Sequence, residues 1–121
     1  MPGAGPGETS GVSTPSDSTP VAITTEGADA RAALSGEFDM NATFTVEPAL
    51  ERALDDPALE RLTVDLSGLS FIDSTGMGVL LRLQGETTAR GVQLAVVPGP
   101  PEVQRVFDSA GLLDTLPFVP G

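Results

Sequence analysis

Short strand patterns and helix patterns alternate along the chain from Val21 to Val119, and this alternation limits the folds open to it. In order, we expect strands at 21–25 and 31–35, a helix, a strand at 61–66, a helix at 74–89, a strand at 92–97, a helix at 102–110 and an edge strand at 116–119. The order β-β-α-β-α-β-α-β predicts a single α/β domain in which a mixed, mostly parallel β-sheet is packed with α-helices.

The longest helix has the clearest boundaries. It follows the strand Arg61–Leu66, whose leucine and valine side chains alternate, and we expect it to begin near Ser74 and to stop at Gly91 in a left-handed conformation. Its inner face is expected to carry Met77, Leu80, Leu81 and Thr88. The next strand, 92–97, is almost wholly apolar, which is typical of a strand covered by helices on both faces.

The first helix is marked by several competing signals. We expect the segment Gly36-Glu37-Phe38-Asp39 to form a turn, and Thr43 or Thr45 to cap the helix that follows. Pro48 would then lie in the first turn, where proline is tolerated because the missing N–H has no intrahelical acceptor there. The buried stripe of this helix is expected to consist of Leu50, Ala53 and Leu54.

Residues 1–20 differ in composition from the rest of the chain. Fifteen of these twenty residues are Pro, Gly, Ser or Thr, and the apolar ones are Met1, Ala4 and Val12. Such a segment cannot bury enough apolar surface to offset the entropy lost on ordering. We therefore predict a disordered tail at 1–20 and a folded domain at 21–121.

The side-chain inventory excludes most catalytic chemistry. The 121 residues include no His, Cys, Tyr, Trp or Lys, so neither a Ser-His-Asp nor a Cys-His pair can form, nor a zinc site of the usual nitrogen and sulfur type. Without lysine, a Schiff base and a phosphate loop ending in Gly-Lys are also excluded. A hydrolase with paired carboxylates stays open as an alternative. We expect no enzyme activity, no cofactor and no metal site.

The charge and hydropathy pattern restrict the partners. With 17 acidic and 6 basic residues the net charge is −11, which repels nucleic-acid backbones and anionic membranes. The longest apolar run is four residues, Leu94–Val97, too short to span a bilayer, and the N-terminus lacks the pattern of a signal peptide. We expect a cytoplasmic protein that binds other proteins, without direct contact to nucleic acid or membrane.

One segment between a strand and a helix carries the candidate chemistry. In 69–78, Asp73 or Ser74 stands where a helix N-terminus presents unpaired N–H groups and the positive end of its dipole. Gly76 and Gly78 leave the first turn bare, so another surface can approach the backbone. A phosphate on Ser74 would be held by the amides yet add about −1.5 to −2 charge. The plainer alternative is that Asp-Ser is only a helix cap.

Three stretches together resemble one known family. The segment Leu66-Ser67-Gly68-Leu69-Ser70-Phe71-Ile72-Asp73-Ser74-Thr75-Gly76-Met77-Gly78-Val79-Leu80 is similar to the signature of STAS-domain anti-sigma factor antagonists. The turn 36–39 resembles the family's Gly-Glu-Leu/Ile-Asp, and 103–112 resembles its third helix ending in Gly-Leu. The resemblance covers about residues 21–119, and its Asp-Ser-Thr-Gly block is the specific part.

The resemblance implies a switched protein–protein interaction. Members of the family bind an anti-sigma factor that is also a serine kinase, which frees a sigma factor for transcription. That kinase uses ATP to phosphorylate the serine after the motif aspartate, here Ser74, and a metal-dependent phosphatase restores binding. ATP and metal thus belong to the partners. The implied partner-binding residues are Asp39, Asp73, Ser74, Thr75, Gly76 and Met77.

Several alternatives remain at this point. Asp39 is equally explained as a turn carboxylate, Thr75 is a second possible phosphate acceptor, and Met77 fits the core. A different function within the family is a STAS scaffold or transporter-regulatory module that is never phosphorylated. A third reading is a hydrolase with Ser74 as nucleophile, which lacks any side-chain base other than carboxylate.

Overall fold

The computed structural model describes residues 20–120. Four strands and three helices follow one another in the order β-β-α-β-α-β-α. Their bounds are β1 Val21–Glu26, β2 Asp29–Phe38, α1 Met40–Leu54, β3 Arg61–Ile72, α2 Ser74–Arg90, β4 Gln93–Val97 and α3 Pro101–Ser109. The α/β class and the mixed sheet predicted from the sequence are confirmed. Residues 1–19 of the predicted tail lie outside the described range.

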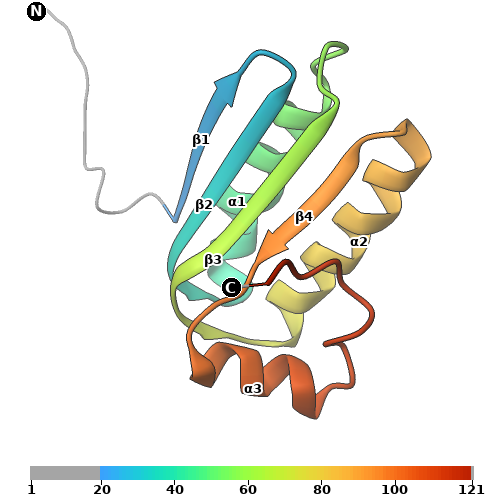
Figure 1. Cartoon of the computed structure of the whole chain (residues 1–121). Coiled ribbons are helices and arrows are strands. Elements are labelled where there is room, and N and C mark those ends of the chain that lie inside the picture. Colours follow the sequence, from blue (N-terminus) through green and yellow to red (C-terminus); the bar gives the residue numbers. More distant parts are fainter. Residues whose placement is uncertain (1–19, 121) are drawn as a thin grey trace, which may run out of the picture.

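The sheet has the strand order β1-β2-β3-β4 (Figure 1). β1 and β2 form an antiparallel hairpin that turns at Gly27, whose φ of 62° lies in the left-handed region that glycine adopts without strain. β2, β3 and β4 are mutually parallel because α1 and α2 carry the chain back between them. The carboxyl ends of β2 and β3, and the beginnings of the helices that follow, therefore lie at one end of the sheet.

The core lies between the sheet and the pair of helices α1 and α2, which run side by side along it (Figure 1). Alternate residues of the central strands point into it, as the period of two requires. The largest fully buried side chains are Phe38, Phe107, Leu34, Leu50, Leu62, Leu66, Ile72 and Leu80. α3 packs against β3 across the end of the sheet, with Val103 and Phe107 buried beneath it.

The start of α1 differs from the sequence prediction. The helix begins at Met40, and its cap is Asp39 rather than Thr43 or Thr45. Thr43 instead lies inside the first turn, where its hydroxyl donates to the Met40 carbonyl at 2.6 Å. Pro48 consequently lies well inside the helix, on its exposed face. Asp39 follows β2 in an extended conformation, and its carboxylate accepts from the Ala42 amide. The helix can therefore start as soon as the strand ends.

The central strands are also longer than predicted. β2 continues through Gly36, Glu37 and Phe38, which were expected to form a turn, and β3 continues to Ile72. Two register shifts, between Ala33 and Ser35 and between Gly36 and Glu37, let the pair keep its ladder past the glycines. A strand with a partner on each side is stabilised by its neighbours, which overrides the weak strand propensity of its alanines.

Three smaller expectations near the C-terminal half need correction. In α2, Thr87 rather than Thr88 is buried, and Leu81 is half-buried. Only one residue of β4, Val96, is fully buried, so this strand is not covered on both faces. The expected last strand reduces to a single parallel bridge between Val96 and Phe118, because Pro117 has no N–H to extend the ladder. The predicted stop of α2 at Gly91, with φ of 72°, is confirmed.

Candidate functional site

Two helix N-termini lie next to each other at the carboxyl end of the sheet. Phe38 and Ile72 are register partners at the ends of β2 and β3, and each is followed directly by an aspartate. Asp39 Oδ1 accepts from the Ala42 amide at 3.0 Å and caps α1, and Asp73 Oδ1 accepts from the Gly76 amide at 2.9 Å and caps α2. The Asp73 amide donates to the Phe38 carbonyl at 3.3 Å, which ties the second cap to the strand before the first.

Gly76 allows α2 to approach the end of β2 closely. A Cβ at this position would lie 2.6 Å from the Phe38 carbonyl oxygen, 3.0 Å from the Phe38 ring and 3.1 Å from Ile72. Contacts below 3.0 Å are not tolerated by real Cβ atoms, so only glycine fits without moving the helix. Gly78 is different, because a Cβ there would meet only the Arg82 guanidinium at an ordinary 3.6 Å. The sequence had assigned both glycines to an accessible first turn, whereas Gly76 is buried.

Ser74 is the first residue of α2, and it is exposed. The Asp73 side chain accepts a hydrogen bond from the Gly76 amide, and the Asp73 carbonyl accepts one from the Met77 amide at 3.0 Å. The amides of Ser74 and Thr75 therefore have no intrahelical acceptor, as is usual for the first turn of a helix. An anion on the Ser74 hydroxyl would thus meet free N–H groups and the positive end of the helix dipole.

The charged side chains at this end of the sheet are mainly acidic. Asp39 and Asp73 are half-buried caps, and Glu37 is exposed on β2 just before them. The nearest arginine on α2, Arg82, already pairs with Glu47 of α1 at 3.0 Å. A phosphate here would consequently add negative charge to a surface that is already negative.

Large exposed apolar side chains gather at the same end. Phe44 is 75% exposed and Met40 is 60% exposed, both on the first turns of α1, and Phe71 near the end of β3 is 46% exposed. Sequence reasoning did not assign Met40 and Phe44, because it placed the start of α1 at Thr43 or Thr45. Had Asp39 been taken as the cap, Met40 and Phe44 would have followed as neighbours on one face of the new helix.

The predicted site residues all lie at this end, with different exposure. Asp39, Asp73 and Thr75 are half-buried and Ser74 is exposed, so each presents some surface to a partner. Gly76 and Met77 are buried on the inner face of α2. Direct contact of any of these residues with a partner stays a prediction.

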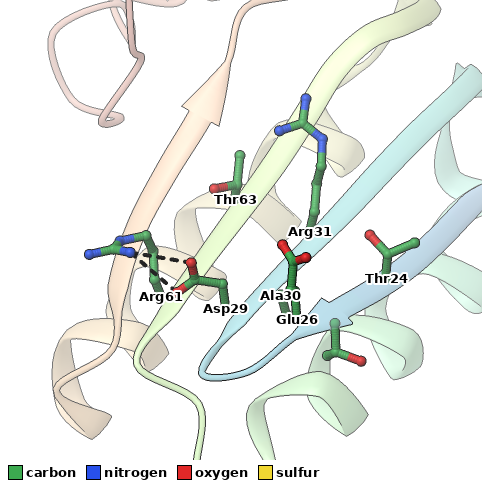
Figure 2. A pocket seen from close by; sticks show the side chains of 8 residues that line it. Thr24, Glu26, Asp29, Ala30, Arg31, Arg61 and Thr63 are labelled. Carbon is green, nitrogen blue, oxygen red and sulfur yellow. Dashed lines mark hydrogen bonds and ion pairs between the residues drawn. The ribbon is translucent and has the colours of Figure 1, made fainter.

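A hollow lies at the opposite end of the sheet. It is open, has a volume of about 460 Å³, and is lined by residues that include Thr24, Glu26, Arg31 and Thr63 (Figure 2). Both arginines at this hollow are paired, Arg61 with Asp29 at 3.2 Å and Arg31 with Asp65 at 2.7 Å. Among the described residues that line the hollow, both guanidinium charges are therefore offset by carboxylates, which disfavours an anionic ligand.

Asp65 belongs to that sheet face and has a shifted pKa. Burial alone would raise the pKa of this carboxyl, but hydrogen bonds from Ser67 and pairing with Arg31 hold the pKa below its usual value. The result is an ionised structural carboxylate. Between residues 20 and 120, no three acidic, His or Cys side chains come together as metal ligands. No helix in that range is long and apolar enough to cross a membrane.

Comparison with known proteins defines the family. Residues 22–120 match the model of the STAS domain, so the chain belongs to the STAS domain family. An anti-sigma F factor antagonist of Paenibacillus polymyxa is 32% identical over 85 residues, which are 70% of this chain and 73% of that protein. A probable sulfate transporter of Arabidopsis thaliana is 38% identical over 61 residues, which are 50% of this chain and 10% of the transporter.

Solved structures agree with this assignment. An anti-sigma factor antagonist from Mycobacterium paratuberculosis has a TM-score of 0.73 at 28% identity, with 90% of this chain and 91% of that chain covered. The Bacillus anti-sigma factor antagonist SpoIIAA in its unphosphorylated form has a TM-score of 0.70 at 23% identity, with 83% and 88% covered, which shows the shared fold. SpoIIAA has also been solved in a phosphorylated form. The resemblance drawn from the sequence is confirmed at the level of the family.

Proposed function

We propose that this protein is an anti-sigma factor antagonist that binds an anti-sigma factor with serine kinase activity, and that phosphorylation of Ser74 ends the binding. The observation that carries the proposal is the position of Ser74, exposed at the first residue of α2 and beside the two aspartate caps. The chain belongs to a family in which similar proteins are named anti-sigma factor antagonists. When this protein binds the anti-sigma factor, the sigma factor is released.

The local physics favours a switch that acts through surface charge. A phosphate at a helix N-terminus is stabilised by the dipole and by the free amides, by about 0.3–1 kcal/mol at an exposed site. The fold should therefore tolerate the modification. At an interface, the new dianion and the neighbouring Asp73 have to be desolvated together, and an unpaired buried charge costs several kcal/mol. Binding is lost while the domain stays folded.

The partners supply the remaining chemistry. The kinase brings ATP, and a separate metal-dependent serine phosphatase returns Ser74 to its hydroxyl form. The antagonist itself needs no cofactor and acts in the bacterial cytoplasm without contacting nucleic acid or membrane. Its role is regulatory and not enzymatic.

Phosphorylation by the cognate kinase tests the switch residue. With the kinase and ATP, the wild-type protein should gain one phosphate, and Ser74→Ala should gain none, as measured by intact mass. Ser70→Ala is a matched control that should still gain one phosphate, because Ser70 is also exposed but lies within β3 and not at the N-terminus of α2. A phosphate that maps to Thr75 instead would move the switch by one residue and contradict the assignment.

Binding measurements test the consequence. Ser74→Asp should weaken binding to the anti-sigma factor at least about tenfold, equivalent to about 1.4 kcal/mol, whereas Ser74→Ala should bind like the unmodified protein. Circular dichroism should be the same for all three proteins. Equal binding by Ser74→Asp and wild type, together with no phosphate on Ser74, would favour an unswitched STAS scaffold or transporter module.

A further inference from the structure

α1 presents two large apolar side chains to solvent on one face. Met40 is 60% exposed and Phe44 is 75% exposed, and a spacing of four residues makes them neighbours on the helix surface. Glu47, one turn further on, lies on the same face and pairs with Arg82 of α2 at 3.0 Å. Met40 and Phe44, which we call the α1 shoulder, therefore flank the side of α1 that is turned toward α2.

The shoulder plays no part in the core. The buried face of α1 is made by other residues, among them Val46, Ala49 and Leu50. On α2, Gly78 precedes Arg82 by one turn, and the surroundings of Gly78 are open apart from the Arg82 guanidinium. The shoulder thus stands beside Gly78, a position of α2 that has no side chain and leaves room for an incoming group.

The charge around the shoulder selects among possible occupants. Glu37, Asp39 and Asp73 surround the starts of the two helices, and Arg82 is already neutralised by Glu47. A second copy of this chain, with net charge −11, would bring like charges together, and an anionic lipid surface would be repelled in the same way. The complementary occupant is a protein that offers an apolar pocket with basic groups at its rim.

We infer that the α1 shoulder is the apolar anchor by which this protein docks on its anti-sigma factor, with Phe44 entering a pocket of the partner whose basic rim faces Asp39 and Asp73. The identity of the partner rests on the proposed function. Aromatic side chains that become fully desolvated dominate the energy of such interfaces. The anchor supplies affinity, and Ser74, at the start of the adjacent helix, decides whether the surfaces can close.

The test compares matched variants of the full chain in binding to the purified anti-sigma kinase. Phe44→Gln should weaken binding by about tenfold or more, and Met40→Gln by less. Glutamine is a good helix former and both side chains are exposed, so the melting temperature should stay the same. Ile23→Thr, a change at a 37% exposed apolar residue on β1, is the control and should bind like wild type. Added salt should weaken wild-type binding, because the rim contacts are ionic.

The outcomes separate this inference from the proposed function. If Ser74→Asp abolishes binding but Phe44→Gln binds within about twofold of wild type, the anchor is wrong and the switch stands. If Phe44→Gln loses binding while Ser74→Asp does not, the anchor stands and the switch is wrong. Self-association that Phe44→Gln removes, or binding of wild type to anionic vesicles, would assign the shoulder to another occupant. A wild-type chain that binds no anti-sigma kinase overturns both.

Discussion

Replacing Gly76 by alanine should destabilise the domain, although the same change elsewhere in α2 should stabilise it. The added Cβ would lie 2.6 Å from the Phe38 carbonyl oxygen and 3.0 Å from the Phe38 ring. The carbonyl belongs to the end of a central strand, so it cannot turn away as a flexible side chain would. Either α2 or the end of β2 has to shift.

Two opposing effects set the size of the change. Forcing one extra carbon into a packed site costs about 1–3 kcal/mol, whereas alanine in place of glycine gains up to about 1 kcal/mol in a helix interior. Gly76 lies in the first turn, where the gain is smaller, so we expect a net loss of about 1–2 kcal/mol. Gly85→Ala is the matched control, since a Cβ there meets nothing within 4 Å and only the gain remains.

Urea denaturation followed by circular dichroism measures both variants. Gly76→Ala should unfold at lower urea than wild type and Gly85→Ala at higher urea, with equal slopes for all three proteins. In a domain of this size, 1 kcal/mol corresponds to a shift of about 4–8 °C in melting temperature. If Gly76→Ala is as stable as wild type while Gly85→Ala is stabilised, the close approach of α2 to β2 is not what requires glycine.

The remaining predictions concern the Asp39 cap of α1, the half-buried carboxylate of Asp65 and the proposed switch at Ser74. Asp39→Ala removes the cap of α1 and should lower the free energy of unfolding in urea by about 1 kcal/mol, whereas Thr45→Ala should change it little. The reverse result would mean that α1 starts at Thr45 and not at Met40. Asp65→Asn should destabilise the domain by about 1 kcal/mol at neutral pH. Because the folded pKa of Asp65 is lowered, its contribution is full above the ordinary pKa of 3.8 and is lost as pH falls through the folded value, so the two stability curves should converge in acid; a constant difference would contradict this. Ser74→Asp should melt within about 2 °C of wild type, since a dipole favours the anion; a larger loss would mean that binding fails through unfolding.

Local signals were sufficient for the start of β3 and for both ends of α2. The alternation at Arg61–Leu66 and the glycine at position 91 each determine the local structure through a few neighbouring residues. The same reasoning identified Asp73 and Ser74 as the start of α2.

Long-range contacts explain what the sequence could not show. Asp39 caps α1 because β2 runs beside β3 to its very end, and that pairing joins residues far apart in the chain. Without it, Thr43, Thr45 and Pro48 are equally good signs of a helix start. The exposed pair Met40 and Phe44 was missed for the same reason, since a face exists only once the helix phase is known. Likewise, the ring of Phe118 makes an edge-on contact with the ring of Phe107 in α3, with ring centroids 5.2 Å apart, and a single bridge to Val96 holds the last segment against β4 without a regular strand.

The starts of α1 and α2 are joined, and this limits how a phosphate at one end of the sheet can affect the rest of the domain. The Phe38 carbonyl is bonded to the Asp73 amide, and Gly76 packs directly on it, so this end of the sheet has little freedom to rearrange. On the proposed mechanism, a phosphate changes what the surface repels without changing where its atoms lie. The opposite sheet face, with Arg31 and Arg61, then looks the same in both forms. A second protein bound there would be unable to tell the active antagonist from the silenced one.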